Sequence, residues 1–295
     1  MRHVYDCPLR WADMDSLRHV NNVVYVDYLQ EARVDMFRVH APGPEAEELA
    51  EGVVVVSHEL EFVEPLTFRT EPVRIEMWCE EVRAATFRLG YEVLDELPDG
   101  GRRVYLRAGS VLAPYSFADH RLRRIRADER SVLEQVSGPR QLEPAPQSPV
   151  PNLLREAAAA HTYSCRVRWS DIDSYGHVNN VKYVEYYQEA RIALLGELGH
   201  GSPDQDVSDS HVVARIDVSY ARPVEFRPEP VEVRTWVGRV GRSSYELVAA
   251  VCDDATVYST SRAVLVGFDL ATSRPRPLGE SERAHLTARA APPSC

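Results

Sequence analysis

The chain reads RWADMDSLRHVNNVVYVDYLQEAR at residues 10–33 and RWSDIDSYGHVNNVKYVEYYQEAR at residues 168–191. The two copies keep a constant offset of 158 as far as the pair Trp78 and Trp236, without an insertion. Over residues 5–33, 19 of 29 positions are identical to their counterparts, whereas ordinary amino-acid usage gives about two by chance. We interpret this as a tandem duplication, which predicts two copies of one fold paired as an intramolecular pseudo-dimer.

The bulk composition is that of a folded, acidic protein. A chain of 295 residues with 44% hydrophobic content is expected to form about two domains. Its net charge of -11 argues against a nucleic-acid or anionic-membrane partner, because either role needs a basic face. The start has no signal-peptide pattern, and the longest aliphatic run, residues 53–56, is too short to span a bilayer. We therefore expect a cytoplasmic protein.

The five cysteines are scattered and form no CxxC pair. Cys7 and Cys165 are repeat partners in strand-like stretches, where a reduced, half-buried thiol is the ordinary expectation. We predict that no cysteine is catalytic and that the chain has no metal site.

A proline-rich stretch separates the two copies. It predicts a linker at residues 137–159, between a first domain at 1–136 and a second at 160–281. The last residues, 282–295, are expected to be a tail.

Each half shows the same order of elements. Apolar residues recur at helical spacing over 23–37 and over 181–195, which predicts one helix of about four turns per half. Either of two asparagines can cap each helix: Asn21 or Asn22, and Asn179 or Asn180. Strand-like segments follow at residues 53–62, 73–82, 87–94 and 104–113, and again near 212–220, 231–240, 245–251 and 257–266.

These elements predict an α+β fold in which an antiparallel sheet packs on a single helix. The helix is apolar around much of its circumference, which a surface helix is not. The sheet is therefore expected to wrap it.

Each copy presents Asp-x-Asp-Ser-x-x-His-Val-Asn-Asn just ahead of its helix. A carboxylate there can attack a carbonyl or activate water, while N–H groups at the helix start stabilise a developing oxyanion. Two alternatives stay open at this point: the first aspartates, Asp13 and Asp171, can be helix or turn caps, and Asp-x-Asp beside a histidine can bind a metal.

The pattern RWxDxDxxGHVNNxxYxxYxxEAR resembles the acyl-CoA thioesterases of the hotdog fold, the 4-hydroxybenzoyl-CoA thioesterase-like group, and also the plant acyl-carrier-protein thioesterases. The resemblance covers both halves and implies a tandem hotdog with thioester pockets at the interface of its halves. It also implies a catalytic carboxylate at Asp15 and Asp173, an amide that polarises the thioester carbonyl at Asn22 and Asn180, and a contribution from His19 and His177.

The two copies depart from the pattern unequally. The motif glycine is kept as Gly176 but is Arg18 in the first half, and a positive φ that glycine allows is poorly tolerated by arginine. Leu17 and Tyr175 stand where the plant enzymes have an asparagine, so the catalytic network of the plant enzymes is not carried over to either half. We therefore hypothesise unequal pockets, with the Asp173 site the more competent.

The leading hypothesis is hydrolysis of an acyl-CoA or acyl-carrier-protein thioester, with coenzyme A as part of the substrate and no separate cofactor. The alternatives are a non-catalytic acyl-CoA-binding module and an enoyl-CoA hydratase-like hotdog, whose typical Asp-x-Asn-Pro-x-His is absent. Acyl preference depends on pocket depth, to which Tyr28, Tyr186 and Tyr187 contribute unless they only pack in the core. Further assembly into a homo-oligomer is compatible with the resemblance.

Overall fold

The computed structural model describes residues 1–41, 52–116, 119, 121–143, 160–197, 209–272 and 274–290. The chain divides into two compact units, Met1–Pro144 and Ala145–Cys295. Most of the predicted linker, from residue 144 to residue 159, lies outside the described residues. None of the described helices is long and apolar enough to cross a membrane.

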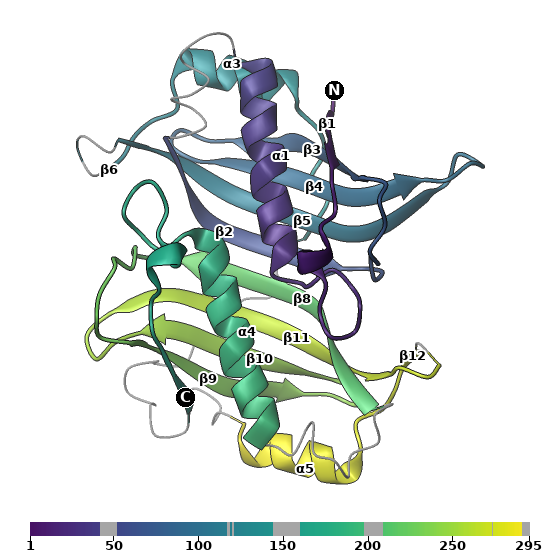
Figure 1. Ribbon diagram of the computed structural model, residues 1–295. Helices are drawn as coiled ribbons and strands as arrows, with labels where there is room; N and C mark the ends of the chain where they lie inside the picture. Colours follow the sequence, from purple (N-terminus) through teal and green to yellow (C-terminus); the bar gives the residue numbers. More distant parts are fainter. Residues whose placement is uncertain are drawn as a thin grey trace. The chain divides into compact units, whose positions relative to one another are not determined.

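The first unit is an antiparallel sheet with one long helix (Figure 1). In chain order its elements are β1 (His3–Cys7), η1 (Trp11–Asp13), α1 (Val24–His40), β2 (Val53–Phe62), β3 (Val73–Val82), β4 (Phe87–Glu96), β5 (Arg102–Ser116), β6 (Arg121–Leu122) and α3 (Ala127–Gln135). The strands follow the order β1-β3-β4-β5-β2, with β6 paired to β5.

The second unit repeats this arrangement. Its elements are β7 (His161–Cys165), η3 (Trp169–Asp171), α4 (Asn180–Glu197), β8 (Asp209–Tyr220), β9 (Val231–Val240), β10 (Ser244–Cys252), β11 (Val257–Asp269), β12 (Arg274–Pro275) and α5 (Glu280–Ala288). The order β7-β9-β10-β11-β8, with β12 on β11, is that of the first unit. The predicted α+β fold, a sheet packed round one long helix in each half, is confirmed.

The long helix of each unit buries one face against its sheet. Helix α1 packs on β1 and β3, and α4 packs on β7, β9 and β10. In α1, Leu29, Ala32 and Met36 are fully buried at the i, i+3, i+7 spacing of a single helical face. In α4, Ala190 and Leu194 occupy the corresponding places. Burial of this face supplies most of the helix stability, because an isolated helix of this length is marginal in water.

Strand β4 is buried on both of its faces, although its alternation leaves charged residues on the outer one. On that face Arg88, which is only 4% exposed, donates to Glu59 at 3.0 and 3.1 Å and to Glu80 at 2.6 Å. The buried charges are therefore compensated by direct ion pairs, as burial requires.

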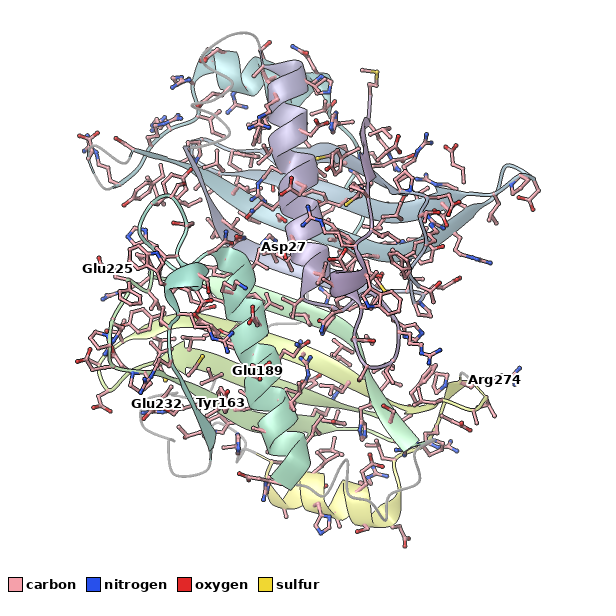
Figure 2. All side chains as sticks on the ribbon, viewed as in Figure 1. Asp27, Tyr163, Glu189, Glu225, Glu232 and Arg274 are labelled. Carbon is pink, nitrogen blue, oxygen red and sulfur yellow. The ribbon has the colours of Figure 1, made fainter. Side chains whose placement is uncertain are left out.

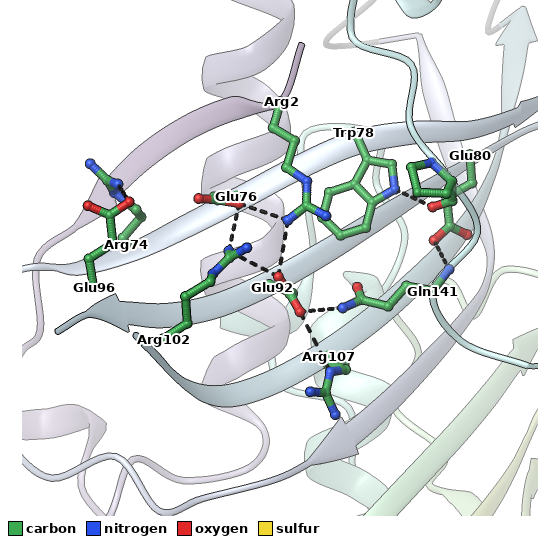
Figure 3. Close-up of polar contacts among 11 residues, drawn as sticks. Arg2, Arg74, Glu76, Trp78, Glu80, Glu92, Glu96, Arg102, Arg107 and Gln141 are labelled. Carbon is green, nitrogen blue, oxygen red and sulfur yellow. Dashed lines mark hydrogen bonds and ion pairs between the residues drawn. The ribbon is translucent and has the colours of Figure 1, made fainter. Parts of the chain in front are cut away.

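Residues 137–143 cover this outer face (Figure 3). The Trp78 indole N–H donates to the Pro139 carbonyl at 2.8 Å, and the Arg2 guanidinium lies 4.0 Å from the Trp78 ring centroid. The Gln141 backbone N–H donates to Glu80 at 3.0 Å. The first seven residues of the predicted linker, 137–143, are thus part of the first unit, because the sheet offers them polar partners that the sequence pattern does not reveal.

Two short helices, α3 and α5, were not predicted, and α5 contains residues 282–288 of the predicted tail. Each has few apolar positions, so its periodicity is weak. In the first turn of each helix, a glutamate carboxylate accepts the backbone N–H of the residue three positions before it. Glu129 accepts that of Arg126 at 2.7 Å, and Glu282 accepts that of Gly279 at 2.9 Å. A glutamate at this position of the first turn is the sequence feature that could have indicated both helices.

His58 on β2 makes the first unit sensitive to acid. Its side chain is 1% exposed, its Nδ1 lies 2.8 Å from the Ser110 hydroxyl, and burial lowers its pKa to about 3. The second unit has Ile216 at the same place, because Ile216 pairs with Ala263 as His58 pairs with Ser110.

We expect His58→Ile to reduce the loss of stability on acidification. The folded imidazole stays neutral down to its lowered pKa, whereas the unfolded one binds a proton below pH 6.5, so stability contributed by the neutral ring falls as the pH drops through this window. Between pH 7 and pH 5 the wild type should lose about 2 kcal/mol more unfolding free energy than the variant. Urea unfolding at both pH values measures this difference, and equal losses would contradict it.

Candidate active site

The loop ahead of each long helix is closed by a buried aspartate. The Asp13 carboxylate accepts the Arg10 backbone N–H at 2.7 Å and the Tyr28 hydroxyl at 2.6 Å, and its backbone carbonyl accepts the Asn21 N–H at 2.9 Å. These bonds join the start of the loop, its end and the second turn of α1. Burial and the Asp13 hydrogen bond together raise the pKa of Tyr28, which keeps its hydroxyl a donor.

The second unit repeats these bonds. The Asp171 carboxylate accepts the Arg168 N–H at 2.8 Å and the Tyr186 hydroxyl at 2.7 Å, and its carbonyl accepts the Asn179 N–H at 2.9 Å. Asp13 and Asp171 thus have a structural role, the first of the two alternatives weighed for them. Their partners Tyr28 and Tyr186 lie fifteen residues further along the chain. The sequence indicates them only as pocket or core residues, because it does not show this bond.

The second aspartate of each motif, Asp15 or Asp173, is held through one oxygen of its carboxylate. Asp15 Oδ1 accepts the backbone N–H groups of Leu17 at 2.8 Å and His19 at 3.1 Å. Asp173 Oδ1 accepts those of Tyr175 at 2.9 Å and His177 at 3.3 Å.

Both of these carboxylates are half-buried, and within the described parts of the chain their Oδ2 atoms accept no hydrogen bond. Each carboxylate therefore has a fixed direction and an oxygen available for chemistry.

The loop backbone is the same in both copies. Asp15 N–H donates to the His19 carbonyl at 2.8 Å, as Asp173 N–H does to that of His177. Arg18 adopts a φ of 63° and Gly176 a φ of 80°, both left-handed. Arginine therefore takes the conformation that the sequence analysis reserved for glycine, at a cost of about 1 kcal/mol. The hydrogen bonds of the first loop are therefore the same as those of the second.

One asparagine of each pair caps the helix, which decides between the two alternatives. Asn21 Oδ1 accepts the Val23 N–H at 2.9 Å, and Asn179 Oδ1 accepts the Val181 N–H at 3.0 Å. The next residue is left for another role. The Asn22 side-chain Nδ2 is buried and has no hydrogen-bond partner among the described residues. It is therefore an unsatisfied donor. Asn180 is the first residue of α4.

The two histidines follow the aspartates and lead into the helix. Residues His19 and His177 form isolated β-bridges with Thr67 and with Glu225, which is labelled in Figure 2. Their backbone N–H groups hold the aspartates, as described above. Neither imidazole makes a hydrogen bond to the described part of the chain, and both are half-buried.

The cysteine thiols near the two loops are held in the protonated form. Burial raises the pKa of Cys7 to about 12 and that of Cys165 to about 11, which disfavours the nucleophilic thiolate. Among the residues that the structure describes, no group of three or more His, Cys, Asp or Glu side chains could hold a metal ion.

A cavity lies between α4 and the sheet of the second unit. It contains about 340 Å³ of empty space, counting the part open to solvent, and about 20 Å³ of this is wide enough for the centre of a water molecule. Its walls include Val184, Tyr187, Arg191, Ile216, Thr235 and Ala249. Tyr187, the third candidate pocket tyrosine of the sequence analysis, thus lines a cavity, unlike Tyr28 and Tyr186, which bond to the loop aspartates.

The family model of the thioesterase-like superfamily matches residues 9–146 and 167–287, one match in each half. No curated protein matches the chain. Several solved structures share its fold along most of its length.

A structure from Lactobacillus plantarum, provisionally named an oleoyl thioesterase, is 16% identical with a TM-score of 0.70, covering 90% of this chain and 96% of its own. An acyl-ACP thioesterase from Bacteroides thetaiotaomicron is 16% identical with a TM-score of 0.66, covering 90% and 97%. The 12:0-ACP thioesterase from Umbellularia californica is 17% identical with a TM-score of 0.66, covering 94% of each chain. These likenesses confirm the double hotdog fold.

We expect Tyr28→Phe and Tyr186→Phe each to lower the unfolding free energy by about 1.5–3 kcal/mol, because each removes a hydrogen bond to a buried carboxylate. Tyr163→Phe is the matched control, since the half-buried Tyr163 on β7 (Figure 2) makes no hydrogen bond through its hydroxyl to the described residues. Urea unfolding measures all three. Equal effects of Tyr186→Phe and Tyr163→Phe would show that the bond to Asp171 is not stabilising.

We expect Gly176→Arg to be tolerated at a cost of about 1 kcal/mol, because the side chain must enter the left-handed region but meets no neighbour. No atom lies within 4 Å of a Cβ built at Gly176. Thermal unfolding and a crystal structure of the variant check both points. A rearranged Asp173 loop would contradict the equivalence of the two copies.

Proposed function

This chain belongs to the thioesterase-like superfamily, and from the site described above we propose that it hydrolyses acyl thioesters to a free acid and a thiol. The proposal rests on the carboxylate of Asp15 or Asp173. Two backbone N–H groups fix one of its oxygens, and the other oxygen accepts no hydrogen bond from the described residues. Fixing a carboxylate in this way lets it act without first reorganising.

In the proposed reaction Asp173 Oδ2, and in the first copy Asp15 Oδ2, removes a proton from water as the water oxygen attacks the thioester carbonyl carbon. The C–S bond of the resulting tetrahedral intermediate then breaks, and the thiolate leaves with the proton that the carboxylate returns. General base catalysis of this kind contributes about 10²–10⁴ in rate.

The oxyanion needs donors, and the helix start offers them. We assign this role to Asn22 and Asn180, the residues that follow the capping asparagines. The buried, unpartnered Nδ2 of Asn22 supports the assignment, because an acceptor is expected for such a group. A positioned donor at a developing oxyanion contributes about 3–4 kcal/mol to the barrier.

We assign His19 and His177 a positioning role. Their backbone N–H groups orient the carboxylates, and their half-buried imidazoles lie between the aspartate and the helix start in the sequence. The substrate class is an acyl-CoA or acyl-carrier-protein thioester. Two of the structures that share the fold are named as thioesterases of acyl-ACP, and the sequence pattern resembles that of acyl-CoA thioesterases.

We infer that the Asp173 copy carries the larger share of the activity. The two loops are equivalent in their hydrogen bonds, so the difference is assigned to the space beside the helix. The second unit has a cavity along α4 where the first unit has the buried Tyr91 ring, at the place of Ala249.

We expect Asp173→Asn to remove most of the thioesterase activity and Asp15→Asn less, with the double variant losing at least about a hundredfold in kcat. Asparagine keeps an Oδ1 acceptor and replaces the charged, basic second oxygen by an amide NH2 group. Release of free thiol from a panel of acyl-CoAs and acyl-carrier proteins measures this.

Asp99→Asn is the matched control for that series, because Asp99 Oδ1 also accepts a backbone N–H two residues ahead, that of Gly101 at 2.9 Å, in a hairpin of the first unit. Equal losses at Asp15 and Asp173 would overturn the asymmetry. Tight acyl-CoA binding without any thiol release in the wild type would instead identify a binding module.

Single-turnover hydrolysis in ¹⁸O-labelled water distinguishes a general base from a nucleophile. With a general base, the acid formed in the first turnover contains the label and the aspartate does not. If the aspartate attacks the carbonyl itself, the thiolate leaves and a mixed anhydride forms. Attack of labelled water on its aspartyl carbonyl then puts the label in Asp173 and releases an unlabelled acid, so label in Asp173 identifies a nucleophile. We expect the first result, by mass spectrometry of the product and of the peptide.

A further inference from the structure

Arg191 on α4 is a buried cation without a carboxylate. Its side chain is only 9% exposed, and it makes no ion pair or hydrogen bond within the described residues. Burial lowers its pKa to about 10, and the Tyr245 phenol is the one group that opposes this. An uncompensated buried guanidinium is costly, so a partner from outside the chain is expected.

The first unit shows what such a partner looks like. Arg33 is the repeat counterpart of Arg191 and is 8% exposed. The fully buried phenol of Tyr91 lies against it, close enough for the positive charge of Arg33 to counteract the rise in the pKa of Tyr91 that burial causes. The chain itself therefore places a phenol oxygen near the guanidinium in this unit, although Arg33 Nη1 and the Tyr91 hydroxyl make no hydrogen bond within the described residues.

The second unit also has a phenol near its guanidinium, that of Tyr245, but it has none at the position of Tyr91 and has space there instead. Ala249 pairs with Thr235 and Ser261 in the register in which Tyr91 pairs with Met77 and Ala108. Ala249 thus occupies the position of Tyr91, and the cavity beside α4 opens there.

The same exchange makes the cavity more polar. Tyr187 and Thr235, which line it, replace Leu29 and Met77 of the first unit at the constant offset. Both are buried, and the Tyr187 hydroxyl and Thr235 Oγ1 have no hydrogen-bond partner. Two unsatisfied hydroxyl groups beside an unpaired guanidinium form a set of donors suited to an oxyanion.

The cavity lies on the same face of α4 as Asn180, further along the helix. Asn180, Val184, Tyr187 and Arg191 are spaced i, i+4, i+7 and i+11, so they share one face of α4. Eleven residues of helix separate Asn180 from Arg191 by about 16 Å. An acyl group whose carbonyl lies at Asn180 would therefore extend toward the guanidinium.

We propose that this cavity binds a carboxylate at the far end of the acyl group, so that the substrate is the monothioester of a dicarboxylic acid. The inference rests on the proposed thioesterase function and specifies its substrate class. One carboxylate oxygen occupies the space that the Tyr91 phenol fills in the first unit, and Arg191 pairs with it. A methyl-ended chain would leave the guanidinium and both hydroxyl groups unpaired.

The test compares acyl-CoA pairs of matched length, one ending in a methyl group and the other in a carboxylate. The readout is the ratio of their kcat/KM values. We expect the wild type to favour the carboxylate, and Arg191→Gln and Ala249→Tyr each to lower this ratio about tenfold to a hundredfold, the effect of losing a charged hydrogen bond. Ala249→Tyr installs the residue of the first unit and does not depend on how Arg191→Gln folds.

Arg33→Gln is the matched control, because it removes the equivalent buried arginine from the unit whose cavity position is filled. It should leave the ratio unchanged. A wild type that prefers methyl-ended chains, or variants that slow both substrates equally, would overturn the proposal.

A binding measurement separates this inference from the thioesterase proposal. Free dicarboxylic acids of the same lengths should raise the Tm of the wild type and not that of Arg191→Gln or Ala249→Tyr, whether or not any thioester is hydrolysed. If acetate or chloride alone reproduces the shift, the cavity is a site for a small free anion and the substrate assignment fails. Hydrolysis without any of these shifts would retain the thioesterase and reject the carboxylate site.

Discussion

The bond between a loop aspartate and a helix tyrosine organises each unit. Asp13 and Tyr28, like Asp171 and Tyr186, join the loop to a helix turn that lies fifteen residues away in the chain. The aspartate carbonyl also accepts the N–H of the capping asparagine. With both ends of the loop tied to the helix, the second aspartate is presented near the start of the helix.

The two units have kept this loop and changed the surroundings of the helix. Every backbone bond of the first loop has a counterpart in the second, including the left-handed residue. By contrast, His58, Tyr91 and Ser110 are replaced by Ile216, Ala249 and Ala263 at matching register positions. The loop tolerates little change because its backbone N–H and C=O groups are joined by a repeated set of hydrogen bonds, whereas sheet residues exchange more freely when volume is compensated. The two units have therefore diverged in the residues that surround the helix and not in the loop.

Much of this could be predicted from the sequence. The long helices and most strands follow from periodicity, and the repeated motif marked the residues of the candidate site. The short helices α3 and α5 were missed because Val132, Leu133 and Leu286 give too weak a period. The Tyr28–Asp13 bond and the cavity were out of reach for another reason: both depend on contacts between distant segments. Tyr91 and Ala249 still stand at the constant offset, but their place beside Arg33 and Arg191 depends on how the strands pack on the helix, which the sequence does not show.

The Tyr91 and Ala249 positions have a consequence for how such a protein can evolve. A void in a core lowers stability, and in a single-domain ancestor that loss would fall on the whole fold. Duplication supplies a second copy whose filled core is unaffected, so one unit can open a space while its sibling stays closed. Arg33 and Arg191 stand at equivalent positions, so the buried charge is common to both units, and the units differ in whether a side chain fills the space beside it. Latent chemistry of this kind is available to any duplicated fold whose core already contains a polar group.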